Sequence, residues 1–180
     1  MTDGGTAGTS SRGSGRSLRE TERTDHREKG MKTHIYTAVD STEIRRGDRR
    51  YGYVITAEGR EQKRQDVGIV DGTYHEASLK AVTEALDRFD PAIPCEIEIH
   101  CEDKFVTYHA EHSLEQKWQF CGWKNSRGKE IANRDLWQLL YNMIRIRHHR
   151  ITFTGGKHKY SEYLRQAMKE EDYPAREMPL

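Results

Sequence analysis

The possible chemistry of this chain is indicated first by carboxylates at the ends of its predicted elements. Asp40 closes the first alternating apolar segment, Glu102 and Asp103 follow a later one, and Glu76 opens a segment of helical periodicity. Sites in α/β sheets gather at the carboxyl ends of strands. If the two strands are neighbours, Asp40 and Glu102 can converge, and Glu76 can reach them from a covering helix.

Clustered carboxylates of this kind favour divalent cations. Like charges repel and raise each other's pKa unless a cation lies among them. Hard oxygen ligands suit Mg²⁺ or Mn²⁺, and two such ions about 4 Å apart can activate a water and stabilise a leaving oxygen in phosphodiester cleavage. The alternative interpretation is that each carboxylate is a solvated cap, which is the common role of a single one.

A second feature is a basic loop bracketed by tryptophans, CGWKNSRGKEIANRDLW, which starts at Cys121. Basic side chains bind phosphates without reading sequence, and the aromatic rings can brace the loop or pack on a sugar. The alternative is that the tryptophans are core residues and the lysines only solubilise. The candidate nucleic-acid-binding residues here are Lys117, Trp118, Trp123, Lys124, Arg127 and Lys129.

Periodicity predicts the elements that position these residues. Strands are expected at 32–40, 51–57, 60–70, 95–101 and 149–156, with a turn at RRGD before the second strand and a hairpin at 58–59. Helices are expected from His75 to the break at 90–94, and at 102–112, 114–120, 132–146 and 161–171, with Asn133 as an N-cap. A strand meander followed by βα units predicts an α/β fold with a mixed sheet.

Composition and length predict one ordinary domain. The first thirty residues contain no aromatic residue, so we expect a disordered tail at 1–30, a domain at 31–172 and a flexible end at 173–180. No apolar run approaches the ~20 residues of a membrane span. The three cysteines include no CxxC pair, which favours the cytoplasm. A net charge of +1 leaves nucleic-acid binding to local patches.

From Tyr36 onward, the chain resembles the type 1 ribonuclease H family. The most specific segment is WQFCGWKNSRGKEIANRDLW, which is similar to the family's basic protrusion and the helix after it. YTAVDS, HEASLKAVTEAL and CEDKFV resemble the segments that carry its first three carboxylates, and the order is kept over about 32–170. The resemblance implies a five-stranded mixed sheet flanked by helices, its first three strands antiparallel. It also implies hydrolysis of the RNA strand of RNA–DNA hybrids with two metal ions, Mg²⁺ or Mn²⁺.

The resemblance also implies catalytic roles, residue by residue. Asp40 and Glu76 are the first two metal ligands. Glu102 is the third where the family has Asp, because it shares a strand face with Glu98 and His100, whereas Asp103 would need a bulge to replace it.

Two further catalytic candidates lie near the end of the chain. His158 in TGGKHK resembles the family's mobile proton-transfer histidine. Glu162 in YSEYLRQ stands for the family's last metal-binding Asp.

The implied partner is an RNA–DNA hybrid. We expect the chain to act as a monomer and to have no membrane partner. The family reads 2′-hydroxyls partly through an Asn pair and a Gly-rich segment, whereas DSTEIRRGDRR is short and Gly-poor and GTYHE has no Asn. Ser41, Thr73 or backbone groups are the candidates to replace them. A basic cluster beside Asp40 either follows phosphates or solvates a turn; it consists of Arg45, Arg46, Arg49 and Arg50. Two alternatives remain open: a binding module whose metal site has drifted, and a related nuclease with another nucleic-acid substrate.

Overall fold

Five strands form one mixed sheet in the order β3-β2-β1-β4-β5. They are β1 (Lys32–Val39), β2 (Gly47–Ala57), β3 (Lys63–Gly72), β4 (Glu96–Cys101) and β5 (Arg150–Gly155). β1, β2 and β3 are antiparallel neighbours, and β4 pairs parallel with both β1 and β5. The expected mixed sheet is therefore confirmed, and the carboxyl ends of β1 and β4 lie side by side.

The chain is seen in a computed structural model that describes residues 31–170. The tail expected at 1–30 and the flexible end expected at 173–180 lie outside the described residues. The helices are α2 (Tyr74–Asp87), α3 (Lys104–His112), the π-helical turn η1 (Leu114–Trp118), α4 (Arg134–Ile146) and α5 (Ser161–Lys169). No helix between residues 31 and 170 is both long and apolar enough to cross a membrane.

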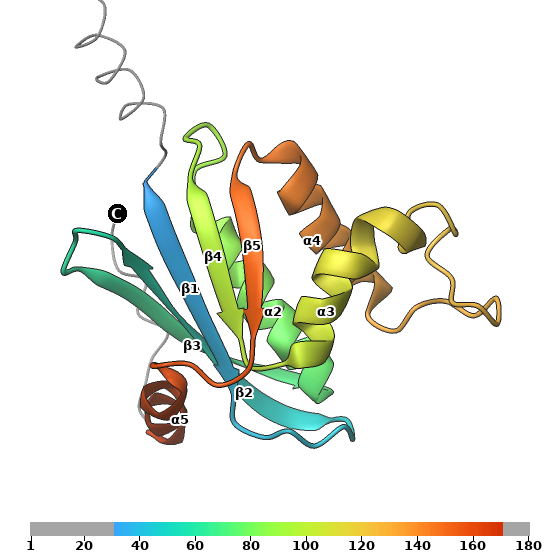
Figure 1. Ribbon diagram of the computed structural model, residues 1–180. Helices are drawn as coiled ribbons and strands as arrows, with labels where there is room; N and C mark the ends of the chain where they lie inside the picture. The colour runs from blue at the N-terminus through green and yellow to red at the C-terminus, as the bar shows by residue number, and fades with distance from the viewer. Residues whose placement is uncertain (1–30, 171–180) are drawn as a thin grey trace, which may run out of the picture. The chain divides into compact units, whose positions relative to one another are not determined.

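The helices cover the two faces of the sheet unequally. In Figure 1, α2 and α4 lie behind the sheet and α5 lies in front of it. The main core forms on the α2 side, where Ile35, Ile97 and Ile99 are fully buried. On the other face, α5 packs its Leu164 against the β1 residue Tyr36. Strand alternation thus sends the odd-numbered residues of β1 and β4 into the main core.

The remainder of the front face is called here the open face. Its residues occupy even-numbered positions of three parallel strands, and β5 contributes exposed threonines. The open face consists of His34, Glu98, His100, Thr152 and Thr154.

One local expectation was wrong, and a second was confirmed in position but not in its hydrogen bond. β2 begins at Gly47 rather than at 51, because its ladder with β3 continues to the Gly47–Gly72 pair, so part of RRGD is strand and not turn. Asn133 stands at the N-cap position of α4, but it has φ 60° and its side chain makes no capping hydrogen bond. Capping needs an extended backbone that aims the side chain at the first-turn amides, and a left-handed residue does not provide it.

Candidate active site

Asp40 directly follows β1 and is exposed at the carboxyl edge of the sheet. Its backbone N–H donates to the carbonyl of Arg50 at 3.0 Å, which extends the β1–β2 ladder and fixes the residue's position. The side chain borders a shallow hollow whose other lining residues are Arg50, Arg165, Met168 and Lys169. Asp40 therefore faces solvent in a positively charged setting.

Glu102 directly follows β4, on the parity of the open face. Its side chain is only 7% exposed, and one carboxylate oxygen accepts a 2.6 Å hydrogen bond from Arg165 of α5. The other oxygen, Oε1, is buried and has no hydrogen-bond partner among the described residues. A buried carboxylate oxygen without a donor is costly, and a cation is one group that would satisfy it.

Asp103, the alternative third carboxylate, has a different task. It is 2% exposed and caps α3 by accepting the N–H groups of Phe105 at 3.0 Å and Val106 at 3.3 Å. Its second oxygen lies 2.6 Å from Nδ1 of His75, whose ring stacks on Phe105. Asp103 thus stabilises the α2–α3 junction, whereas Glu102 is the carboxylate paired with α5.

Glu76 projects from the first turn of α2, where a carboxylate is favoured by the helix dipole. Its carboxylate lies against Gly72, so closely that a Cβ at that position would be 2.6 Å from Oε2. Arg46 approaches the same oxygen at 3.4 Å. The absence of a side chain at position 72 is what leaves room for Glu76.

The predicted catalytic carboxylates lie at one end of the sheet without forming a tight cluster. In the part of the chain that the structure describes, no three of them bring ligand oxygens within 4.8 Å of one another. Two of them are instead paired with arginines, Glu76 with Arg46 and Glu102 with Arg165. The all-oxygen donor set and the unsatisfied Oε1 of Glu102 nevertheless fit Mg²⁺ or Mn²⁺.

His158 lies between β1 and α5, with both ring nitrogens engaged. Nε2 donates to the carbonyl of Thr37 at 2.8 Å, and Nδ1 accepts the N–H of Tyr160 at 3.3 Å. Burial lowers the pKa of His158, while the Thr37 carbonyl and the charge of Glu102 oppose that change. To carry a proton to a substrate, this ring must leave the Thr37 carbonyl.

Glu162 is exposed in the first turn of α5. The buried Ser161 and the Glu102-paired Arg165 lie one turn apart on the same side of that helix. Glu162 is displaced from Ser161 by about 100° around the helix axis. Its role as a metal ligand stays a prediction.

The basic loop has a defined conformation. The side chain of Asn125 accepts the backbone N–H groups of Arg127 at 2.9 Å and Lys129 at 3.0 Å, and Lys124 pairs with Glu130 in an isolated bridge. All four predicted phosphate-binding side chains are exposed: Lys117, Lys124, Arg127 and Lys129. The loop therefore presents its charges from a folded turn, beside α3 and α4 (Figure 1).

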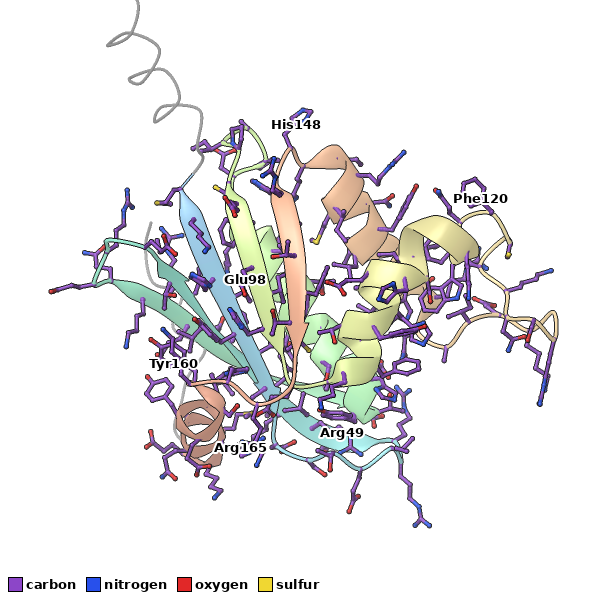
Figure 2. All side chains as sticks on the ribbon, viewed as in Figure 1. Arg49, Glu98, Phe120, His148, Tyr160 and Arg165 are labelled. Atoms are coloured by element: carbon purple, nitrogen blue, oxygen red, sulfur yellow. The ribbon has the colours of Figure 1, made fainter. Side chains whose placement is uncertain are left out.

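Trp118 and Trp123 brace this loop rather than project from it. Trp118 stacks on His109 at 5.0 Å and meets Trp137 edge-on at 4.9 Å. Trp123 meets Tyr141 edge-on, and both tryptophans are partly buried against the main core. Phe120, by contrast, is 78% exposed, and Figure 2 labels it just beyond η1.

The residues expected near the 2′-hydroxyl groups have local roles. Thr73 caps α2 by accepting the N–H of Glu76 at 3.2 Å, and Ser41 accepts the N–H of Glu43 at 3.3 Å. Both side chains are partly exposed, so the structure leaves each accessible at one surface.

Arg49 is buried and is not available to bind phosphates. It is 4% exposed and donates to the carbonyls of Gly72 at 3.0 Å and Ser41 at 3.3 Å. Its task is to hold the 41–46 turn against the end of β3. The neighbouring Arg46 is exposed and pairs with Asp71 as well as with Glu76.

Comparison with known proteins decides the family. The RNase H family model matches residues 30–157. The chain belongs to the ribonuclease H family. Ribonuclease H of Syntrophomonas wolfei subsp. wolfei is 30% identical over 102 residues, which are 57% of this chain and 69% of that protein. The resemblance that the sequence motifs indicated is confirmed.

Solved structures show the same fold as this ribonuclease H family chain. LC9-RNase H1, described as a type 1 RNase H with the type 2 active-site motif, matches with a TM-score of 0.61 and 15% identity, over 77% of this chain and 70% of its own. A foamy viral protease-reverse transcriptase solved in complex with RNA/DNA hybrid matches with a TM-score of 0.54 and 12% identity. That match covers 91% of this chain and 21% of the viral one.

Two residues of this ribonuclease H family site were missed by sequence reasoning. Arg165 supplies the counter-charge to Glu102, and Nδ1 of His75 lies within hydrogen-bond distance of Asp103 at 2.6 Å. His75 could have been noticed because it immediately precedes Glu76 on a predicted helix. Arg165 carried no such signal, since local pattern does not reveal which strand end an α5 side chain will meet.

Proposed function

We propose that this ribonuclease H family enzyme is an endonuclease that hydrolyses the RNA strand of RNA–DNA hybrids. The observation that carries the proposal is the buried, unsatisfied Oε1 of Glu102 at the carboxyl end of β4, next to the strand that ends at Asp40. A carboxylate held in this state is poised for a cation. Mg²⁺ or Mn²⁺, as two ions, is the proposed cofactor, held by Asp40, Glu76, Glu102 and Glu162.

Bound divalent ions supply an activated water and neutralise charge on the leaving oxygen. The residues of the chain prepare this chemistry. Glu102 would hold an ion through its unpartnered Oε1, while Arg165, which donates to Oε2 at 2.6 Å, keeps the carboxylate in place. His158, once its ring leaves the Thr37 carbonyl, is placed to carry a proton at the leaving oxygen.

The proposed substrate follows from charge placement and from the viral neighbour. That reverse transcriptase was solved in complex with RNA/DNA hybrid. In this chain, the exposed basic loop offers a sequence-independent contact with the DNA-strand phosphates. Ser41 and Thr73 are the hydroxyl groups proposed to contact the RNA near the catalytic carboxylates.

We also propose that the enzyme acts as a cytoplasmic monomer. Its three cysteines are free thiols, of which Cys95 and Cys101 are buried and Cys121 is exposed. An exposed thiol is best preserved in a reducing compartment. Sedimentation of the purified chain tests the monomer.

The decisive experiment is cleavage of labelled RNA–DNA hybrid, double-stranded RNA and double-stranded DNA, with Mg²⁺ and separately with Mn²⁺. Wild type is expected to cut only the RNA strand of the hybrid. Asp40→Asn removes a charged ligand at an exposed position, so it should lose at least about 100-fold in rate while it keeps its fold. Unimpaired cutting by Asp40→Asn would exclude the mechanism.

One observation favours a second function, a binding module that has lost catalysis. Arg165 occupies one oxygen of Glu102, and α5 turns Ser161 rather than Glu162 to the side where Arg165 lies. If no substrate is cut under either metal and the hybrid is still bound, the binding function replaces the enzymatic one.

A further inference from the structure

A group of side chains of metal-binding types lies on the open face and includes none of the proposed catalytic carboxylates. It consists of His34 on β1 and of Glu98 and His100 on β4. On the same strand face, Glu98 is four residues before Glu102, about 13 Å away, and His100 is two residues before it, about 7 Å away. Figure 2 labels Glu98 on the front face of the sheet, at a distance from the labelled Arg165.

Strand register brings these three side chains together. β1 and β4 are parallel, and His34 is the register partner of Glu98. His100 is two residues further along β4, so it points to the same face as Glu98. The three side chains therefore converge from two adjacent, hydrogen-bonded strands, a rigid base for a site.

The separation of the two histidine nitrogens is close to that of tetrahedral ligands, and one ligand atom from each of the three side chains lies within 4.8 Å of the others. His34 Nδ1 lies 3.2 Å from His100 Nε2 and 3.5 Å from a Glu98 oxygen, and His100 Nε2 lies 3.6 Å from the other oxygen. Zn²⁺ binds histidine and carboxylate ligands at about 2.0–2.1 Å, which places tetrahedral ligands about 3.3–3.4 Å apart. Octahedral ligands at the same bond length would be only about 2.9 Å apart.

The surroundings orient these ligands as outer residues of metal sites do. The second ring nitrogen of His34 lies 3.4 Å from a carboxylate oxygen of Glu58. Thr154 donates to Glu98 at 3.3 Å, and the ring of His100 stacks on Tyr36 at 4.5 Å. A metal-bound histidine commonly donates its other N–H to a carboxylate in this way, which fixes the ring and its tautomer.

Burial also suits an open metal site. The side chains of His34 and His100 are each 18% exposed and that of Glu98 is 29% exposed. The ligands are thus held by the protein while one side remains open to solvent. Three protein ligands with a fourth position left for water is the arrangement of accessible zinc sites.

We propose that His34, Glu98 and His100 form a binding site for one tetrahedral divalent transition-metal ion, with Zn²⁺ the best match. A nitrogen-rich donor set selects Zn²⁺ over Mg²⁺, which prefers oxygen ligands. The site shares no ligand with the proposed catalytic ions and prefers a different metal, and it lies further back along β1 and β4.

The test uses Zn²⁺ alone, titrated calorimetrically into the full chain carrying Asp40→Asn, Glu102→Gln and Cys121→Ser. These changes remove catalytic ligands and the exposed thiol, so that binding reports the open face. One equivalent of Zn²⁺ is expected to bind. His34→Gln or His100→Gln should weaken it by at least about 100-fold, and Glu58→Gln by about 10-fold.

The matched control is His148→Gln, an exposed histidine that Figure 2 labels away from the open face and that should leave the affinity unchanged. Glu98→Gln provides a further ligand variant, and each variant is checked for folding by its melting temperature in EDTA. Co²⁺ in place of Zn²⁺ should give the intense visible absorption of a tetrahedral ion. Absence of Zn²⁺ binding, or an affinity that the His34, Glu98 and His100 variants leave unchanged, would overturn the proposal.

Discussion

The carboxylate of Glu102 forms a salt bridge with one side chain, that of Arg165. Arg165 donates to one of its oxygens at 2.6 Å, and the other oxygen is buried. A carboxylate in this position needs a compensating positive charge, because burial penalises its charged form. If Glu102 binds the proposed divalent ion, that ion and Arg165 compete for the same carboxylate, and removal of the guanidinium should favour the ion.

Replacing Arg165 should expose this competition. Arg165→Gln leaves Glu102 without its charge partner, so the metal-free protein should lose about 1–3 kcal/mol of unfolding free energy, less than for a fully buried pair because Arg165 is 27% exposed. Addition of Mn²⁺ should then stabilise the variant more than the wild type. Thermal melts with and without Mn²⁺ measure both effects.

Arg150→Gln serves as the control, since Arg150 is exposed at the start of β5. It should behave as wild type in both melts. Equal stabilisation of wild type and Arg165→Gln by Mn²⁺ would show that the arginine and the metal do not share Glu102.

At the scale of single residues, the sequence predicted where a side chain lies better than it predicted which groups that side chain contacts. Strand parity selected Glu102, and the structure shows Asp103 engaged as the cap of α3. Parity is a local property, so it can be read from neighbouring residues. The pairing of Glu102 with Arg165 joins two elements distant in sequence, and it depends on the rotation of α5, which no local pattern specifies.

The connection from α4 to β5 contains a matched pair of histidines. His149 is 8% exposed, and its Nδ1 accepts the N–H of Cys95 at 3.1 Å, whereas His148 is exposed. Burial, followed by the charge of Arg147, lowers the pKa of His149 below its ordinary value of 6.5. The folded state therefore favours the neutral ring, which alone can accept that hydrogen bond.

This arrangement predicts a loss of stability in acid. A depressed folded pKa gives stability that is present above about pH 6.5 and is lost as the pH falls through the folded value. His149→Gln keeps an acceptor but cannot be protonated, so it should lose less unfolding free energy between pH 7.5 and pH 5 than the wild type does. Urea unfolding at the two pH values measures this.

His148→Gln is the control and should follow the wild type, because His148 is exposed and its replacement removes no buried group. Other histidines with lowered pKa values, among them His100, His109 and His158, contribute to the same trend. The dependence of unfolding free energy on pH should thus be weaker in His149→Gln than in the wild type, but it should not disappear. An unchanged slope would mean that His149 is not held neutral.

At the scale of elements, the sequence predicted which elements exist but not all their ends. Alternation located β1 and β4 within one residue, because buried parallel strands carry a strong pattern. β2 is longer than expected because its first residues pair with β3, whose partner residues lie some twenty positions on. Asn133 failed as a cap because residue type does not reveal backbone conformation.

Across the whole molecule, charge is arranged in patches rather than as a net field. The net charge is +1, yet the basic loop exposes several cations beside α3 and α4. Asn125 holds this loop in its folded conformation before any ligand arrives. Little ordering cost should then oppose its contact with a phosphate backbone.

Removing three of these charges should change the salt dependence of hybrid binding. Each lost phosphate contact lowers the slope of log K against log salt by about one unit. The triple variant Lys124→Gln, Arg127→Gln, Lys129→Gln should therefore lose about three units in an Asp40→Asn background that binds without cutting. Fluorescence anisotropy over a range of salt concentrations measures the slope.

A control with equal charge uses the β2–β3 hairpin, whose exposed basic residues are Arg60, Lys63 and Arg64. Their triple replacement by Gln should leave the slope near the wild-type value. If both triple variants lose the same slope, hybrid binding is not localised at the basic loop.

The alternation of side chains along β4 has a consequence for the mutations that the gene can tolerate. β4 and the residue that follows it place Glu98, His100 and Glu102 on one face and Ile97, Ile99 and Cys101 on the other. Deleting a single codon early in this strand would exchange the two sets, sending charged groups into the core and isoleucines into water. A point substitution in β4 can remove one proposed site and leave the other. A one-residue deletion would disrupt the proposed catalytic site, the proposed zinc site and the core together.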